Sequence, residues 1–155
     1  MKYCYLAGAM EHAPDRGCGW RAEMAAFLQE SLGHEVFNPC VEEETFLPHT
    51  DRKLLGPAKH ENLPKFRKLI RKVIDGDLAM LVNEIDYVVC LWDEHVLNGG
   101  GTHGELTLAY YHDIPVYLVS RLPRQKISSW ILGCTMEYFE DFEPLRQFLR
   151  QNFNK

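Results

Sequence analysis

The sequence has no excess of positive charge and no long hydrophobic run. Its 155 residues carry 17 lysines and arginines against 22 aspartates and glutamates, which gives a net charge of −5. A negative field opposes attraction to a polyanion, so we expect no nucleic acid polymer as a partner. No apolar segment approaches the roughly 20 residues of a membrane-spanning helix, and the N-terminus lacks a signal-peptide cleavage pattern. We therefore expect no membrane partner.

The chain also lacks paired cysteines and the common cofactor motifs. Its five cysteines are scattered without a C-x-x-C pair, which predicts reduced, mostly buried thiols in a cytoplasmic protein. They are Cys4, Cys18, Cys40, Cys90 and Cys134. No histidine or cysteine stands at metal-ligand spacing from His103, and no glycine segment fits a P-loop or a dinucleotide fingerprint. We expect neither a metal nor a cofactor.

Strand and helix patterns alternate along the chain. Apolar runs rich in β-formers predict strands at 3–10, 34–39, 85–92 and 114–119, with a small edge strand at 138–139. Helical spacing of apolar residues predicts helices at 20–32, 64–81, 102–110 and 142–149, with a short one near 127–132. Residues 40–62 carry Pro48, Gly56 and Pro57, and are predicted to form a long loop with one helical turn, of a length that is often a functional lid. The length favours a single domain over residues 1–155.

This alternation predicts an α/β protein with a flavodoxin-like (Rossmann-like) fold. Such a fold is a doubly wound parallel sheet with helices on both faces, and we expect the second strand outermost beside the first. Ligands of these sheets bind at the carboxyl edge, here between the first and third strands. The substrate-binding residues expected there are Gly8, Asn98, Gly99, Gly101 and Thr102.

Glu105 lies in the motif Thr102-His103-Gly104-Glu105 at the expected helix start, and two interpretations remain open. In a capping box, the threonine caps one backbone amide and the glutamate reaches back to another. Alternatively, the helix dipole holds a first-turn carboxylate ionised, which suits a nucleophile that attacks an oxocarbenium-like sugar carbon. A noncatalytic nucleotide-binding module would need only the capping role.

Other charged residues near the expected crevice are weaker candidates. Asp77 lies among apolar neighbours late in its helix, where a carboxyl could protonate a leaving base. Asp75 is expected on a solvated helix face, and Asp86 in a turn or cap. His12, Arg16 and Arg21, in or beside the first loop, could receive a phosphate.

Three segments resemble the nucleoside 2-deoxyribosyltransferase superfamily, which includes nucleoside monophosphate N-glycosidases. The most specific is DYVV at 86–89 followed by GTHGEL at 101–106, similar to that family's strand and G-T-x-x-E helix start. The others are YLAGAM at 5–10, and ISSW at 127–130 with Gly133. Together they span most of the chain.

The resemblance implies a role for four residues. Glu105 would be the catalytic nucleophile, and Tyr5 would orient the glutamate. Asp77 would contact and help protonate the base, with Asp75 as the alternative because the interval from Asp77 to Asp86 is about one residue longer than the family's. Ser128 would reach the substrate phosphate across a homodimer or larger homo-oligomer. The family resemblance thus implies a small-molecule nucleoside or nucleotide substrate.

The resemblance implies an enzyme that cleaves an N-glycosidic bond through a glycosyl-glutamate intermediate. Transfer to another base would make it a nucleoside deoxyribosyltransferase, and capture by water would make it a nucleoside monophosphate N-glycosidase, a hydrolase. Relatives carry aspartate or serine shortly before the glycine of G-T-x-x-E, where this chain has Asn98 and Gly99. The sequence therefore leaves both outcomes open.

Overall fold

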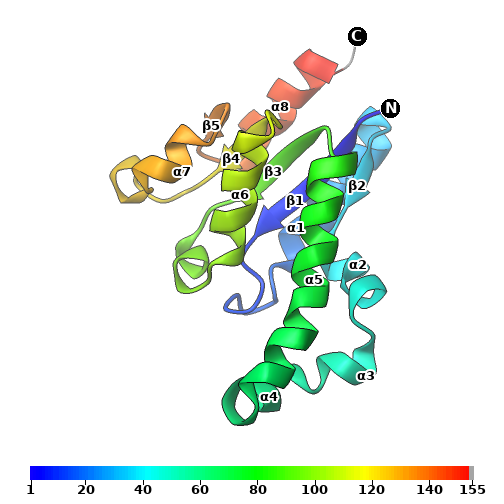
Figure 1. The fold of residues 1–155 in the computed structure, drawn as a ribbon. Helices are drawn as coiled ribbons and strands as arrows, with labels where there is room; N and C mark the ends of the chain where they lie inside the picture. The colour runs from blue at the N-terminus through cyan, green and yellow to red at the C-terminus, as the bar shows by residue number, and fades with distance from the viewer. Residues whose placement is uncertain (154–155) are drawn as a thin grey trace.

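The computed structural model describes residues 1–153, and a five-stranded parallel sheet forms its centre (Figure 1). The strand order is β2-β1-β3-β4-β5. The strands are β1 (Tyr3–Gly8), β2 (Glu35–Phe37), β3 (Tyr87–Leu91), β4 (Val116–Val119) and β5 (Glu137–Phe139). The second strand is outermost beside the first, so the flavodoxin-like prediction is confirmed.

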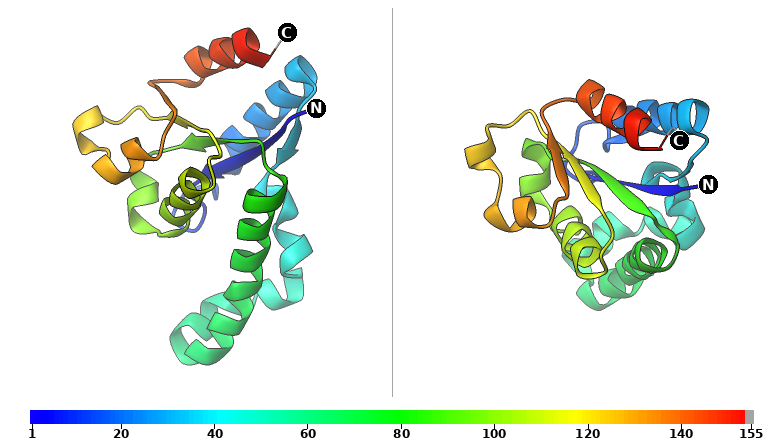
Figure 2. Two further views of the ribbon diagram at one scale, coloured as in Figure 1. Left: turned by 45° about the horizontal axis from the view of Figure 1, so that its top comes forward. Right: turned by 90° about the horizontal axis from the view of Figure 1, so that it is seen from above.

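Helices cover both faces of the sheet (Figure 2). One face carries α1 (Cys18–Leu32) and α8 (Phe142–Phe153), and the other carries α5 (Leu63–Glu84) and α6 (Gly101–Tyr111). Alternate strand residues enter the two cores, so Leu6 packs toward α1 and α8 whereas Tyr5 packs toward α5 and α6. Burial on both faces explains the nearly continuous apolar runs of these strands. A short helix, α7 (Ser129–Gly133), precedes β5.

The predicted loop at 40–62 is wrong, because most of this segment is helical. It contains α2 (Pro39–Phe46), α3 (His49–Arg52) and α4 (Leu55–Glu61). Asn38 caps α2 by accepting a hydrogen bond from the Cys40 amide at 3.0 Å, and Pro39 occupies the first turn, where its missing donor costs nothing. Phe46 of α2 packs against Gly76 of α5, where any side-chain carbon would overlap its ring. Prolines that suggested a loop therefore stand at helix starts and between short helices.

The prediction of five reduced cysteines is also wrong. Cys18, the first residue of α1, forms a disulfide with Cys40 of α2 across a Cα–Cα distance of 5.8 Å. Cys4, Cys90 and Cys134 are free and buried. The two bonded residues stand 22 positions apart, so no short-range motif announces the pair. In the described part of the chain, no helix is long and apolar enough to cross a membrane.

Removing this disulfide is expected to lower the free energy of unfolding by about 3 kcal/mol, because the bond closes a loop of roughly 22 residues in the unfolded chain. Guanidinium unfolding of the Cys18→Ser, Cys40→Ser double variant against unreduced wild type measures the loss. Added reductant should destabilise wild type and leave the double variant unchanged. Titration of the denatured, unreduced protein should count three thiols, and a count of five would contradict the pairing.

Candidate active site

The candidate site lies at the carboxyl ends of β1 and β3, which are neighbours in the sheet. Gly8 at the end of β1 pairs with Leu91 at the end of β3. The chain leaves β1 toward α1 on one face and leaves β3 toward α6 on the other, which opens a crevice in doubly wound sheets. The loops after both strands approach each other, since a side-chain carbon at Gly99 would lie 3.8 Å from Cδ2 of His12.

Tyr5 and Glu105 meet beside this crevice, although a hundred positions separate them in the sequence. The Tyr5 hydroxyl, on β1, donates a hydrogen bond of 2.9 Å to Oε1 of Glu105, on α6. The Tyr5 side chain is fully buried and its ring stacks on Phe37 at a centroid distance of 5.0 Å. A rigid aromatic side chain therefore holds the glutamate from the middle of the sheet.

The capping-box interpretation of Glu105 is wrong. Helix α6 begins at Gly101 with Gly100 as its N-cap, so Thr102 lies inside the helix and is only 6% exposed. Within residues 1–153, no side chain caps this helix start. The Glu105 carboxylate accepts its hydrogen bond from the Tyr5 hydroxyl instead. Tertiary packing, and not local helix capping, determines where this carboxylate lies.

Asp77 lies on α5, which covers the same face of the sheet as α6, the helix that carries Glu105. The pKa of Asp77 is raised to about 7, chiefly by burial and then by the negative charge of Glu43, whereas the charge of Arg21 lowers it. Asp75 is exposed instead, and Asp86 accepts hydrogen bonds from Lys2 Nζ at 2.9 Å and from the Tyr3 amide at 2.8 Å. Asp77 lies close enough to Glu105 for its negative charge to raise the pKa of Glu105.

The pKa of Glu105 is raised to about 7, chiefly by burial and then by the negative charge of Asp77. The Tyr5 hydrogen bond and the charge of Arg21 lower it, but they do not outweigh burial. The sequence predicted that the helix dipole would hold Glu105 ionised, whereas burial and Asp77 raise its pKa. Two nearby carboxyls with pKa values of about 7 allow one to be ionised and the other protonated near neutral pH, which is the arrangement required for one nucleophile and one general acid.

Comparison with known proteins adds the fold relationship. No protein-family model matches the sequence, and no curated protein sequence is significantly similar to it. Among solved structures, it resembles a 2-deoxyribosyltransferase from the psychrotolerant bacterium Bacillus psychrosaccharolyticus with a TM-score of 0.64. The two share 23% sequence identity, and the match covers 93% of this chain and 90% of that chain. The chain shares the fold of a 2-deoxyribosyltransferase.

Within this 2-deoxyribosyltransferase fold, the predicted substrate-binding residues divide into two groups. Asn98 and Gly99, at and after the end of the 3₁₀ helix η1 (Glu94–Asn98), are exposed, as is Gly101. Gly8 and Thr102 are buried, so a ligand would contact their backbone and not their side chains. Ser128 is exposed just before α7, on the part of the surface where α7 packs beside α6.

The three basic side chains considered for phosphate behave differently. Arg21 is only 1% exposed, and its guanidinium donates hydrogen bonds to backbone carbonyls, so it cannot also receive a phosphate from solvent. Arg16 pairs with Glu43 at 2.8 Å. His12 remains exposed near Gly99. Sequence reasoning did not predict that Glu43 would pair with Arg16 and raise the pKa of Asp77, because the segment that carries Glu43 was expected to be a loop.

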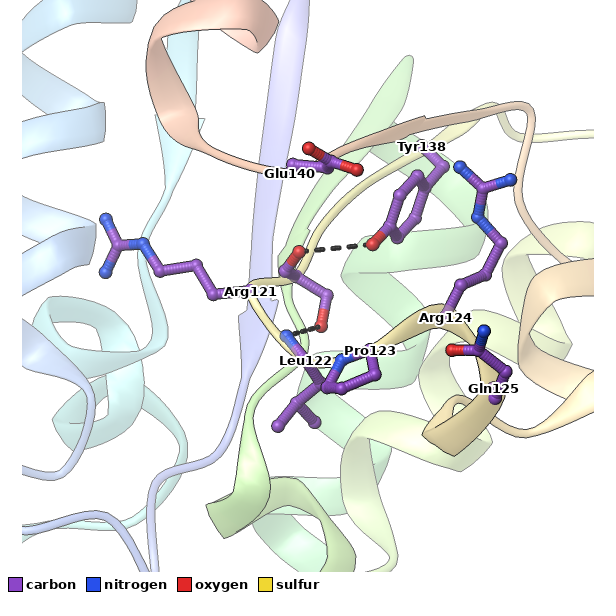
Figure 3. Close-up of a pocket in the computed structure, with 8 residues that line it drawn as sticks. Arg121, Leu122, Pro123, Arg124, Gln125, Tyr138 and Glu140 are labelled. Carbon is purple, nitrogen blue, oxygen red and sulfur yellow. Dashed lines mark hydrogen bonds between the residues drawn. The ribbon is translucent and has the colours of Figure 1, made fainter.

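A hollow of about 610 Å³ lies elsewhere, where β4 and β5 end (Figure 3). Arg124 lies over the ring of Tyr138 at 5.0 Å, and the Tyr138 hydroxyl donates to the Ser120 carbonyl at 3.3 Å. Neither Glu105 nor Asp77 lines this hollow, and its one carboxylate, Glu140, is exposed. Across residues 1–153, no group of three or more His, Cys, Asp or Glu residues is arranged to hold a metal ion.

Asp77→Asn is expected to stabilise the protein at pH 8 and to change its stability little at pH 4. The folded protein holds the Asp77 proton up to a pKa of about 7, whereas the unfolded chain releases it near 3.8. Wild-type stability is therefore full below pH 3.8 and falls as pH rises through 7, and asparagine avoids that loss. Guanidinium unfolding should show a gain on the order of 2 kcal/mol at pH 8.

The exposed Asp75→Asn variant on the same helix is the matched control and should show no such pH-dependent gain. An Asp77→Asn effect of equal size at both pH values would contradict the raised pKa.

Proposed function

We propose that this chain cleaves the N-glycosidic bond of a (deoxy)nucleoside or nucleoside 5′-monophosphate and transfers the sugar to another base. The observation that carries the proposal is the hydrogen bond from the buried Tyr5 hydroxyl to Glu105, with Asp77 nearby on the same face of the sheet. Glu105 does not cap α6 and instead accepts a hydrogen bond from the buried Tyr5 hydroxyl, which supports a role beyond helix capping. The fold shared with a 2-deoxyribosyltransferase supports the same reaction class.

In the first half-reaction, the ionised Glu105 attacks the anomeric carbon of the sugar. Tyr5 holds Oε1, so Oε2 is the attacking oxygen. The bond from C1′ to the base nitrogen breaks, its electron pair goes to the base, and the Asp77 carboxyl donates a proton to the departing base. The products are a glycosyl ester of Glu105 and a free base.

In the second half-reaction, a nitrogen of another base attacks C1′ and displaces Glu105. The incoming base loses a proton to the Asp77 carboxylate, which restores both carboxyls to their starting states. A water molecule at the same position would instead complete hydrolysis. The chain's own carboxyls supply both steps, and the proposal calls for no cofactor.

The proposed active unit is a homodimer or larger homo-oligomer, in which Ser128 of one copy reaches the site of another. Trp130, two positions after Ser128, is 68% exposed, and Tyr110 at 61% and Tyr111 at 80% are exposed on α6, the helix that contacts α7. Trp130 Nε1 donates to Thr107 Oγ1 at 3.0 Å, which holds the indole against α6 while leaving it exposed. Exposed aromatic groups of this kind are typical of protein interfaces.

The test is incubation of the purified protein with nucleosides and their 5′-monophosphates, with and without a free acceptor base. Chromatography should detect base exchange with nucleosides. Release of base from monophosphates without exchange would replace the transferase with a nucleotide hydrolase. Ligand binding without either reaction would favour a noncatalytic nucleotide-binding module and would overturn the proposal.

A further inference from the structure

Arg21 is a buried charge whose partners are backbone carbonyls. It lies on the first turn of α1, is 1% exposed, and donates from all three guanidinium nitrogens. Nε donates to the Leu6 carbonyl at 3.1 Å, Nη2 to Gly8 at 2.8 Å and Nη1 to Gly17 at 3.0 Å. Nη1 makes longer contacts with the carbonyls of Ala9 at 3.3 Å and Arg16 at 3.5 Å. One side chain therefore connects the end of β1 to both ends of the following loop.

The backbone around Arg21 is shaped to accept the guanidinium. Gly17 has a φ of 69°, and a side-chain carbon there would overlap both the Ala9 carbonyl oxygen and Arg21 Nη1. Asp15 holds the adjoining turn by accepting hydrogen bonds from the Gly17 amide at 2.8 Å and the Gly19 amide at 3.0 Å. The loop over residues 9–17 is thus closed around Arg21, and it is the loop that brings His12 close to Gly99.

The same arginine is the positive group near the proposed catalytic carboxyl. The titratable groups near Glu105 are Tyr5 on β1, Cys90 on β3 and Asp77 on α5, and Arg21 on α1 adds the positive charge. Burial lowers the pKa of Arg21, and the charge of Glu105 is the strongest influence that opposes this lowering. An arginine guanidinium is not deprotonated in proteins, so the positive charge of Arg21 is permanent.

We infer that Arg21 is a positioning residue: its guanidinium closes the loop over residues 9–17 onto the carboxyl end of β1, and it places a fixed positive charge beside the proposed site. This inference rests on the proposed function for its meaning in catalysis. Two effects of Arg21 can be measured without turnover: its guanidinium closes the loop over residues 9–17, which we call the clamp, and its charge acts on Glu105. The clamp requires the planar guanidinium, which donates to several carbonyls at once, whereas the effect on Glu105 requires only the positive charge. Two substitutions separate these roles.

The experiment compares Arg21→Lys, which keeps the charge and loses the fork, with Arg21→Met, which loses both. The pKa of Glu105 is read by carbon NMR of its carboxyl, assigned with Glu105→Gln. Arg21→Met should raise that pKa by about one unit, whereas Arg21→Lys should keep it close to the wild-type value. Arg71→Met, an exposed arginine on α5, is the matched control and should change nothing.

Kinetics then tests the clamp. Arg21→Lys should raise KM about tenfold with an unchanged pH profile, and amide exchange over residues 9–17 should accelerate. An unshifted Glu105 pKa in folded Arg21→Met would overturn the electrostatic role, and unchanged amide exchange in Arg21→Lys would overturn the clamp. Should Arg21→Met fail to fold, Arg21→Gln replaces it in the NMR titration. If wild type cleaves no nucleoside, the proposed function fails while NMR and exchange still decide the inference.

Discussion

Glu105→Gln is expected to reduce base exchange by at least about 10³-fold while sparing the fold and nucleoside binding. Glutamine has nearly the same shape and still accepts the 2.9 Å hydrogen bond from Tyr5, but its amide cannot attack the sugar carbon. Turnover is measured by chromatography of the exchanged bases, and binding is measured by isothermal titration calorimetry. Loss of turnover with retained binding would identify Glu105 as the nucleophile.

The control for this substitution is Glu23→Gln, an exposed glutamate on α1, which should retain full activity. Mass spectrometry of wild type quenched during turnover should also find a sugar attached to a peptide that contains Glu105. A well-folded Glu105→Gln protein that still exchanges bases would remove the covalent mechanism.

Asp77→Asn is expected to slow release of an ordinary base by about 10²-fold or more, because the departing nitrogen then lacks its proton donor. The loss should shrink for nucleosides whose bases leave readily without protonation. Comparison of kcat for a poor and a good leaving group measures this difference. Equal losses for both substrates would argue against Asp77 as the general acid.

The pH profile gives a second measure of the same role. Wild-type activity should fall at low pH, where Glu105 is protonated, and at high pH, where Asp77 has lost its proton. Both carboxyls have pKa values of about 7, so the activity maximum should lie near neutral pH. Asp77→Asn should remove the high-pH limb and retain the low-pH limb. A high-pH limb that persists in this variant would assign it to another group.

Local pattern predicted most of the fold but little of the segment 40–62. The apolar run at 85–92 reads as a doubly buried strand because neighbouring residues alone determine that pattern. Pro48 and Pro57 suggested a loop, yet α2, α3 and α4 form there. Asn38 starts α2, and the contact of Phe46 with Gly76 packs it on α5, a contact between residues 30 positions apart. Composition cannot reveal such a contact.

The sequence by itself determined the order of strands and helices, the parallel sheet and the candidate Glu105, since each depends on short-range patterns and a local motif. It left open whether Glu105 caps its helix or faces a substrate. Only the tertiary structure decided that Glu105 does not cap its helix, because the Tyr5 hydroxyl reaches Glu105 through the packing of β1 against α6. Tertiary structure also paired Cys18 with Cys40 and buried Arg21 among carbonyls, because those partners meet only when the loops close over the sheet.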